Sequence, residues 1–258
     1  MLRRWAGARV ELVVNSLHYG CVYAEGGLLG IFYTHAWERP GPVERLRGEA
    51  LSYAWRLLAS LDSTLAERAA AWGAVSAATN AWIDETPGAV KPVSDDAEAL
   101  GLYEAEAVAM IGFIEPLAEK LMEHGVRVVA FDRSPSARRW GRCPRGEPPV
   151  LPDTYADPML RDGGFDAVLV SGSALAHPGA AARLAEAARE GGASRIILLG
   201  PSASIHPRIC AGLGYTHVAS SHPPRENRRE IIEMLQAGYG YRRLKKLLVK
   251  YVAECRVS

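Results

Sequence analysis

Three short segments that begin with glycine or serine are the first candidates for chemistry, because each follows a run of apolar residues typical of a buried strand. Small residues in such places expose backbone N–H groups and hydroxyls, and a following helix adds the positive end of its dipole. This arrangement favours an oxyanion such as a phosphate or a carboxylate. We therefore predict ligand contacts from Gly112, Phe113, Glu115, Ser171, Gly172, Ser173, Gly200, Pro201 and Ser202.

Gly112 and Asp132 also imitate part of a dinucleotide-binding fingerprint, in which a glycine-rich turn precedes an acidic residue by about 20 positions. The imitation is incomplete, because only one glycine of the G-x-G-x-x-G pattern is present and bulky Phe113 and Ile114 stand where a pyrophosphate must approach the backbone. Asp132 is more simply a helix cap or a turn residue. An enzyme that uses a nucleotide or S-adenosylmethionine at this sheet edge is the alternative hypothesis.

Nucleophilic and metal sites have weaker support. The segment 171–173 lacks the G-x-S-x-G pattern of a nucleophile elbow, so serine hydrolysis is not predicted and no catalytic residue is assigned. Among the histidines, His177 and His222 are the better metal candidates, since both fall in loops expected after strands, although no H-E-x-x-H spacing is present. The four cysteines form no C-x-x-C pair, which leaves room for one incidental disulfide. A direct cysteine and histidine metal site is a third hypothesis.

Asn80 is the most informative polar residue of the first half. It lies near the end of a helical segment of small residues, 75–82, whose apolar face is expected to be buried. A buried amide needs hydrogen-bond partners, so one interpretation is a cap or an interhelical hydrogen bond. The other interpretation is a side chain directed at the ligand, and we include Asn80 among the predicted ligand contacts.

The elements that must position these residues change in rhythm along the chain. Beyond the linker that we place at residues 84–102, short apolar segments alternate with helical ones, which indicates a doubly wound parallel sheet. The expected strands are 107–111, 126–131, 167–170, 195–199 and 215–219, and the expected helices are 116–124, 155–160, 178–190 and 205–213. Residues 134–153 form a long irregular insertion, and the tail from Arg225 onward is expected to be helical.

Before the linker, the pattern predicts an antiparallel meander followed by two helices. The expected strands are 9–14, 21–24 and 28–33, with Gly26-Gly27 as the turn between the last two. A helix is expected over 43–59, and a second one runs from a Ser63 or Thr64 cap to Trp82. We therefore predict a small α+β domain at 1–95 and a Rossmann-like α/β domain at 96–258, so that the fold class is α/β.

Composition limits the partners. The formal net charge is +1 and 48% of the residues are hydrophobic, so no overall attraction to nucleic acid or a membrane is expected. The basic turn 241–246 is explained equally well as a solvated helix face. No apolar run reaches the ~20 residues of a membrane span, and the first residues lack the apolar stretch of a signal peptide. We expect a cytoplasmic protein with a small-molecule partner, and a homo-oligomer is the base-rate expectation.

Taken in order, these motifs resemble the family named "putative heavy-metal chelation". Residues 76–81 look like its asparagine-containing helix segment, 111–117 are similar to its glycine-phenylalanine-x-proline stretch, and 171–175 and 200–202 are similar to its two small-residue loops. There are departures: Ala176-His177-Pro178-Gly179 follows where the family's loop continues with asparagine and glycine, and Glu115 replaces a smaller or apolar residue. The resemblance covers most of the chain.

The resemblance implies a cap domain similar to the amino-terminal domain of enolase, a Rossmann-like domain and a cleft between them. It also implies a link to heavy-metal handling. Combined with the strand-end loops, the leading hypothesis is that the chain binds, and in one version modifies, a small oxygen-rich or anionic ligand such as a chelator or a metal complex. The corresponding cofactor candidate is a metal ion or a metal-chelate ligand.

Overall fold

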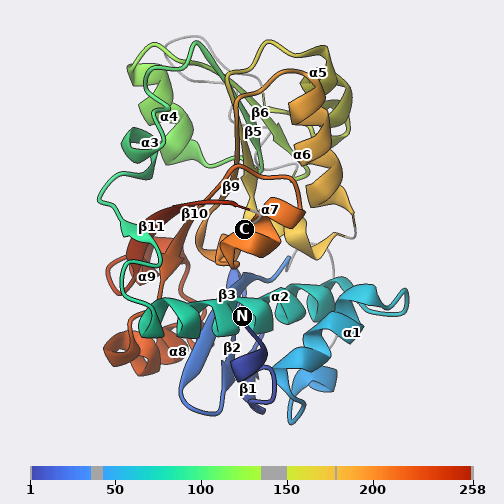
Figure 1. The fold of residues 1–258 in the computed structure, drawn as a ribbon, viewed down its shortest axis with the longest axis vertical. Coiled ribbons are helices and arrows are strands. Elements are labelled where there is room, and N and C mark those ends of the chain that lie inside the picture. The colour runs from blue at the N-terminus through green and yellow to red at the C-terminus, as the bar shows by residue number, and fades with distance from the viewer. Residues whose placement is uncertain (1, 36–42, 135–149, 178, 257–258) are drawn as a thin grey trace.

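The computed structural model describes residues 2–35, 43–134, 150–177 and 179–256. Two sheets organise this part of the chain (Figure 1). A three-stranded antiparallel sheet comes first in the sequence, and an eight-stranded, mostly parallel sheet is built from the remainder. The expected α/β class is therefore confirmed. Among the described residues, no helix is both long enough and apolar enough to cross a membrane.

The small sheet consists of β1 (Val10–Val14), β2 (Tyr19–Ala24) and β3 (Leu28–Tyr33), close to the predicted strands. Gly26 and Gly27 join β2 to β3 with φ values of 76° and 75°. Both lie in the left-handed region that a tight hairpin of this kind requires and that glycine adopts without a steric penalty. The glycine pair thus determines the turn, as its sequence suggests.

Helix α2 (Leu65–Glu85) covers one face of this sheet. It begins with the predicted capping box, in which Thr64 Oγ1 accepts from the Glu67 N–H at 3.1 Å and Glu67 Oε2 accepts from the Thr64 N–H at 2.8 Å. The helix lies very close to β3, because Gly30 and Gly73 carry no side chain at the contact. A Cβ built on Gly30 would be 2.0 Å from the Gly73 carbonyl oxygen.

The predicted helix over 43–59 is wrong for its first part. Only α1 (Ala54–Ala59) is α-helical, and 44–46 and 51–53 are single 3₁₀ turns. Gly48, with φ of 81°, interrupts any continuous helix. Its N–H donates to the Val10 carbonyl at 2.8 Å, and the Val10 N–H donates to the Glu49 carbonyl at 2.8 Å. The segment therefore pairs with the edge of β1, and local periodicity could not reveal this long-range competitor for its backbone groups.

The large sheet has the strand order β4-β11-β10-β9-β8-β5-β6-β7. Six neighbouring strands, β5 to β10, are parallel, whereas β11 runs antiparallel to both β10 and β4. The bounds of the eight strands are β4 Lys91–Pro92, β5 Ala107–Ile111, β6 Arg127–Asp132, β7 Val150–Pro152, β8 Ala167–Ser171, β9 Arg195–Leu199, β10 His217–His222 and β11 Val249–Glu254. The chain order reverses between β5 and β8.

Strand β11 corrects the expectation that the whole tail after Arg225 is helical. Residues 249–254 pair with β10 in register over six residue pairs. The β-branched and aromatic side chains of Val249, Tyr251 and Val252 suit a strand, and Tyr251 is fully buried. β10 itself begins two residues later than predicted and ends at His222, so the segment 220–222 belongs to the strand and not to the loop after it.

Helices cover both faces of the large sheet and the second face of the small one. Their bounds are α3 Asp96–Ala99, α4 Glu115–Glu123, α5 Ala156–Asp162, α6 Ala180–Glu190, α7 Pro207–Gly212, α8 Arg228–Gln236 and α9 Tyr241–Leu244. Although α8 and α9 are late in the sequence, Ile231, Leu235 and Leu244 pack in one buried cluster with Leu29 and Ile31 of β3. The small sheet is thus enclosed between α2 and the late helices (Figure 1).

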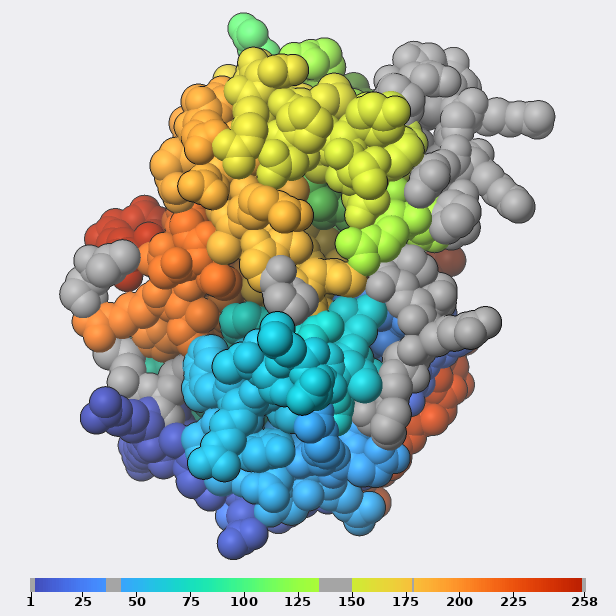
Figure 2. All heavy atoms as spheres, turned by 90° about the vertical axis from the view of Figure 1, so that its right-hand side faces the viewer, coloured from blue at the N-terminus to red at the C-terminus, as the bar shows by residue number. Residues whose placement is uncertain are grey.

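One hydrophobic core crosses from the small sheet to the large one. Phe32 and Ala77 of the first half share a continuous buried cluster with Leu175, Ala203 and Ile205 of the second. Figure 2 shows the corresponding outer view, with the cyan residues of the first half against the yellow and orange residues of the second. Because the contact is apolar and buried, burial itself positions α2 and β3 against the strand-end loops of the large sheet.

Candidate functional site

The loops that follow β5, β8 and β9 meet at the carboxyl edge of the large sheet. A Cβ on Gly112, after β5, would lie 2.7 Å from the Ser171 Cβ at the end of β8. A Cβ on Gly172 would lie 2.5 Å from the Ala203 backbone nitrogen and 2.6 Å from the Ser202 carbonyl carbon. The glycines are therefore what allows these loops to touch. They also flank the reversal between β5 and β8, where open α/β sheets form their ligand crevices.

Serine hydroxyls gather in the loop after β8. This loop is a 3₁₀ turn, η7 (Gly172–Ala176), which Ser171 caps by accepting from the Ser173 N–H at 3.4 Å. The Ser173 hydroxyl donates to the Ser171 hydroxyl at 3.1 Å. Both side chains are half-buried, so they combine a fixed orientation with access from solvent. They are suited to bind a polar oxygen atom of a ligand.

Helix α2 anchors this turn through hydrogen bonds from two of its side chains. The Trp72 indole N–H donates to the Leu175 carbonyl at 2.5 Å, and the Arg68 guanidinium donates to the Ala176 carbonyl at 3.2 Å. These carbonyls belong to η7, so the first half of the chain fixes the loop of the second half directly. The Arg68 contact also brings a positive charge to this side of the turn.

His35, which immediately follows β3, was not among the predicted site residues, yet it lies at the centre of the contact between the halves. Its Nε2 is 3.1 Å from the Ser173 carbonyl oxygen, and its ring centroid is 5.2 Å from that of His177. Burial is the largest of the causes that lower the pKa of His35 to about 4, and the neighbouring His177 acts in the same direction. His35 also has a positive φ of 50°, which is unusual for a residue other than glycine and which no sequence pattern signals.

Arg133, after β6, brings a cation to the same place. Its guanidinium lies 3.1 Å from Nε2 of His177 and donates to Asp153 Oδ2 at 2.9 Å, while 43% of the side chain is exposed. Burial lowers the pKa of His177 to about 4, and the positive charges of Arg133 and Arg68 act in the same direction. At neutral pH the site therefore contains two neutral imidazoles beside accessible positive charge.

The remaining predicted residues lie around this centre in different ways. The Phe113 N–H donates to Asp132 Oδ2 at 2.7 Å, and the Ser134 N–H donates to Asp132 Oδ1 at 2.7 Å, so Asp132 acts as a turn residue. Glu115 is exposed at the start of α4. Gly200, Pro201 and Ser202 lead into the 3₁₀ turn η8 (Pro201–Ala203), where Pro201 and Ser202 are buried.

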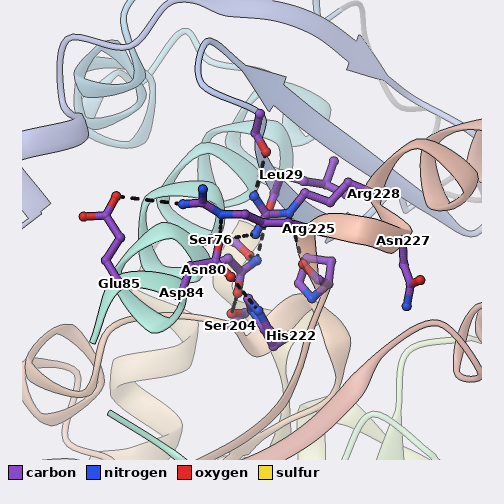
Figure 3. A network of polar contacts seen from close by, with 12 residues as sticks. Leu29, Ser76, Asn80, Asp84, Glu85, Ser204, His222, Arg225, Asn227 and Arg228 are labelled. Carbon is purple, nitrogen blue, oxygen red and sulfur yellow. Dashed lines mark hydrogen bonds and ion pairs between the residues drawn. The ribbon is translucent and has the colours of Figure 1, made fainter. Parts of the chain in front are cut away.

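Asn80 connects the two halves but is enclosed by protein atoms. Its amide nitrogen donates to the Leu29 carbonyl at 2.9 Å, and its oxygen accepts from the Ser204 hydroxyl at 2.8 Å (Figure 3). The Ser204 hydroxyl is in turn 3.0 Å from the Tyr251 hydroxyl. Only 1% of Asn80 is exposed. These buried hydrogen bonds join α2 to β3 and to Ser204 after the η8 turn, and they are neither a helix cap nor a contact between two helices.

Replacing Asn80 with Ala is expected to lower the free energy of unfolding by about 1–3 kcal/mol, because the Leu29 carbonyl and the Ser204 hydroxyl lose a buried partner. Urea denaturation measures the change. Ser76→Ala is the matched control, since it removes only a 3.4 Å contact to the same amide and is expected to cost less than about 1 kcal/mol. Equal losses in the two variants would contradict this role for Asn80.

His222, the second metal candidate, belongs to a separate ion network. Its Nε2 is 2.9 Å from Asp84 Oδ1 near the end of α2, and the other carboxylate oxygen is 3.0 Å from the Arg225 Nε and 2.6 Å from the Arg228 guanidinium (Figure 3). Burial alone would raise the pKa of Asp84, but the hydrogen bonds from His222, Arg225 and Arg228 outweigh it and lower the pKa to about 2. The described part of the chain contains no group of three or more His, Cys, Asp or Glu side chains that could hold a metal ion.

Comparisons with known proteins fit this architecture. A structure from Pyrococcus horikoshii, of unknown function, matches with a TM-score of 0.78 and 21% identity over 98% of this chain and 96% of that chain. One from Desulfitobacterium hafniense, also of unknown function, matches with a TM-score of 0.72 and 19% identity over 96% of this chain and 92% of that one. No curated protein matches. The sequence profile of DUF364, described as "Putative heavy-metal chelation", matches residues 95–254, more than half of the chain, and the chain therefore belongs to this family.

Proposed function

We propose that the chain binds a small oxygen-rich or anionic ligand connected with heavy-metal handling, such as a chelator or a metal complex, in a cleft between the parts 1–95 and 96–258. The observation that carries the proposal is the meeting of Arg133, the Ser171 and Ser173 hydroxyls and the His35–His177 pair at the sheet reversal. Cations and hydroxyls suit carboxylate or phosphate oxygens, and the reversal is where such sheets bind ligands.

A chelated metal suits these groups better than a bare cation. Two neutral imidazoles resemble metal ligands, but Arg133 lies 3.1 Å from the His177 ring and would repel a free metal ion at the same nitrogen. A negatively charged complex would instead be attracted by the guanidinium. The family description supports a link to heavy metals, and the charge of the site supports the anionic form of the ligand.

Within this proposal, the predicted ligand residues have two roles. Ser171, Ser173 and the backbone at Gly112 contact the ligand, while Gly172 and Asn80 position the loops that carry those groups. His177 belongs with the contacting residues through its place beside Arg133. Gly200, Pro201, Ser202, Phe113 and Glu115 form the surrounding loops.

Binding is expected to depend on Arg133. Citrate and inorganic phosphate are the probes, and a probe at a hundred times its dissociation constant should stabilise the native protein by about 2.7 kcal/mol in a thermal-shift assay. Arg133→Gln should weaken binding at least about tenfold, since it removes a charge-assisted hydrogen bond to the anion. Intrinsic stability should hardly change, because the ion pair of Arg133 with Asp153 is partly exposed.

Arg229→Gln is the matched control, because it also removes one guanidinium but from a side chain that is 92% exposed on α8. An equal loss of binding in both variants would mean that only net charge matters and would contradict the proposed site. ATP, NAD and S-adenosylmethionine belong in the same screen. A shift with one of these, and none with citrate or phosphate, would favour the alternative of a nucleotide- or S-adenosylmethionine-dependent enzyme.

A further inference from the structure

A pair of cysteines lies near the amino ends of the parallel strands of the large sheet, whereas the candidate site lies at their carboxyl ends. Cys210 belongs to α7 and Cys255 directly follows β11, and the two form a disulfide with a Cα–Cα distance of 5.6 Å. Cys255 donates its N–H to the Thr216 carbonyl, just before β10 begins at His217. The pair is therefore at the start of β10, whereas the candidate site lies beyond the ends of the parallel strands.

The disulfide opens onto a surface hollow. Cys255 lines this hollow together with Arg189, Tyr215, Thr216, His217 and Glu254, whereas Cys210 is fully buried behind it. A small reagent or ion from solvent can thus reach one sulfur first, with the second directly behind. Arg189 is held in place by donating to the Gly214 carbonyl at 2.6 Å, and its charge favours the thiolate over the thiol form of a nearby cysteine.

The surrounding structure holds the two cysteines together without help from the disulfide. β11 pairs with β10 through six residue pairs and also pairs with β4. The Cys210 backbone N–H donates to the carbonyl of His206, the residue that precedes α7, and the Cys255 N–H donates to the Thr216 carbonyl at 2.8 Å. After reduction, the two sulfurs are therefore expected to stay side by side, because the backbone that carries each of them is anchored separately.

We propose that the reduced pair is a two-thiolate site for a soft monovalent metal ion, Cu(I), and that the disulfide is its closed form. Opening the site takes two electrons and two protons from a cellular thiol reductant, which leaves as its own disulfide. Binding then exchanges two thiol protons for one Cu(I) and gives a bis-thiolate complex with one negative charge. Arg189, at the same hollow, balances that charge.

The number of ligands selects the metal. Soft thiolates favour Cu(I), zinc and iron–sulfur clusters, but zinc in structural sites takes four ligands. Among the residues that the structure describes, no group of three or more His, Cys, Asp or Glu side chains is arranged to hold a metal. Two sulfurs alone satisfy a linear two-coordinate Cu(I) ion. This site is independent of the anion site proposed above, and either one can fail without the other.

The test uses the full chain carrying Cys143→Ser, so that Cys210, Cys255 and the buried Cys21 are the remaining cysteines. One portion is reduced with a phosphine and another is left oxidised, and each is titrated with Cu(I) against the chromogenic chelator bathocuproine disulfonate. The reduced protein is expected to bind about one copper ion per chain, with two sulfur ligands in X-ray absorption, and the oxidised protein is expected to bind none.

Comparing the two redox states of one chain avoids the question of whether a variant folds. Cys255→Ser, at a partly exposed position, is expected to reduce copper retention by the reduced protein about tenfold or more. Cys21 is present in every sample and serves as an internal control. Equal copper binding by the reduced and oxidised protein, no binding by either, or full retention in Cys255→Ser would each overturn the proposal.

Discussion

Gly30→Ala is expected to lower the free energy of unfolding by about 3 kcal/mol or more, because the added methyl group meets backbone and not a movable side chain. Its Cβ would be 2.0 Å from the Gly73 carbonyl oxygen and 2.3 Å from the Ala77 nitrogen, so α2 would have to move away from β3. Since α2 also holds η7 through Trp72 and Arg68, the same shift should weaken ligand binding. Urea denaturation and citrate titration measure the two effects.

Gly7→Ala is the control for this prediction. A Cβ on Gly7 meets nothing within 4 Å, so the stability should change by less than about 0.5 kcal/mol. If Gly30→Ala were as stable as Gly7→Ala, α2 and β3 would not be in the tight contact described, and the positioning of η7 by α2 would lose its basis.

Asp84→Asn is expected to cost about 3–5 kcal/mol, because it leaves the Arg228 guanidinium buried without its negative partner. The Arg228 side chain is only 5% exposed, and its other contacts are the neutral carbonyls of Pro223 and Gly27. The network joins the end of α2 to β10 and α8, so both halves of the chain depend on it (Figure 3). Chemical denaturation at pH 7 measures the loss.

The pH dependence of stability provides an independent check on Asp84. Its pKa is lowered to about 2 in the folded protein, so folding favours the ionised carboxylate. That contribution is fully present above the unfolded-state pKa, near 4, and is lost as the pH falls through about 2. Asp84→Asn should therefore lose less stability than the unchanged protein between pH 4 and pH 2.

Glu85→Gln is the matched control, since this neighbouring carboxylate forms partly exposed ion pairs with Arg4 and Arg225. Its loss should cost less than about 1 kcal/mol. A cost for Asp84→Asn no greater than that of Glu85→Gln would show that the buried network does not link the two halves energetically.

The local sequence was sufficient for elements whose signal is contained in a few neighbouring residues. Continuous apolar runs predicted β5, β8 and β9, because a strand buried on both faces needs no polar alternation. Thr64 and Glu67 predicted the start of α2, since both partners of a capping box lie within one helical turn. The small residues at 112, 171–173 and 202 marked the strand-end loops that the structure brings together.

The tertiary structure decided the features that depend on partners distant in the sequence. β11 forms because its backbone pairs with β10. Residues 43–53 do not form an α-helix because part of their backbone pairs with the edge of β1. His35 enters the site only when β3 is placed against η7, which the burial of α2 achieves.

For Asn80, the sequence predicted a buried amide in need of partners, and only the fold identified them as Leu29 and Ser204. The same holds for Asp84, whose partners come from β10 and α8. Periodicity and capping report which groups are buried and where helices begin. The pairing of those groups is a property of the assembled core, because the partners lie at least 51 positions apart in the sequence.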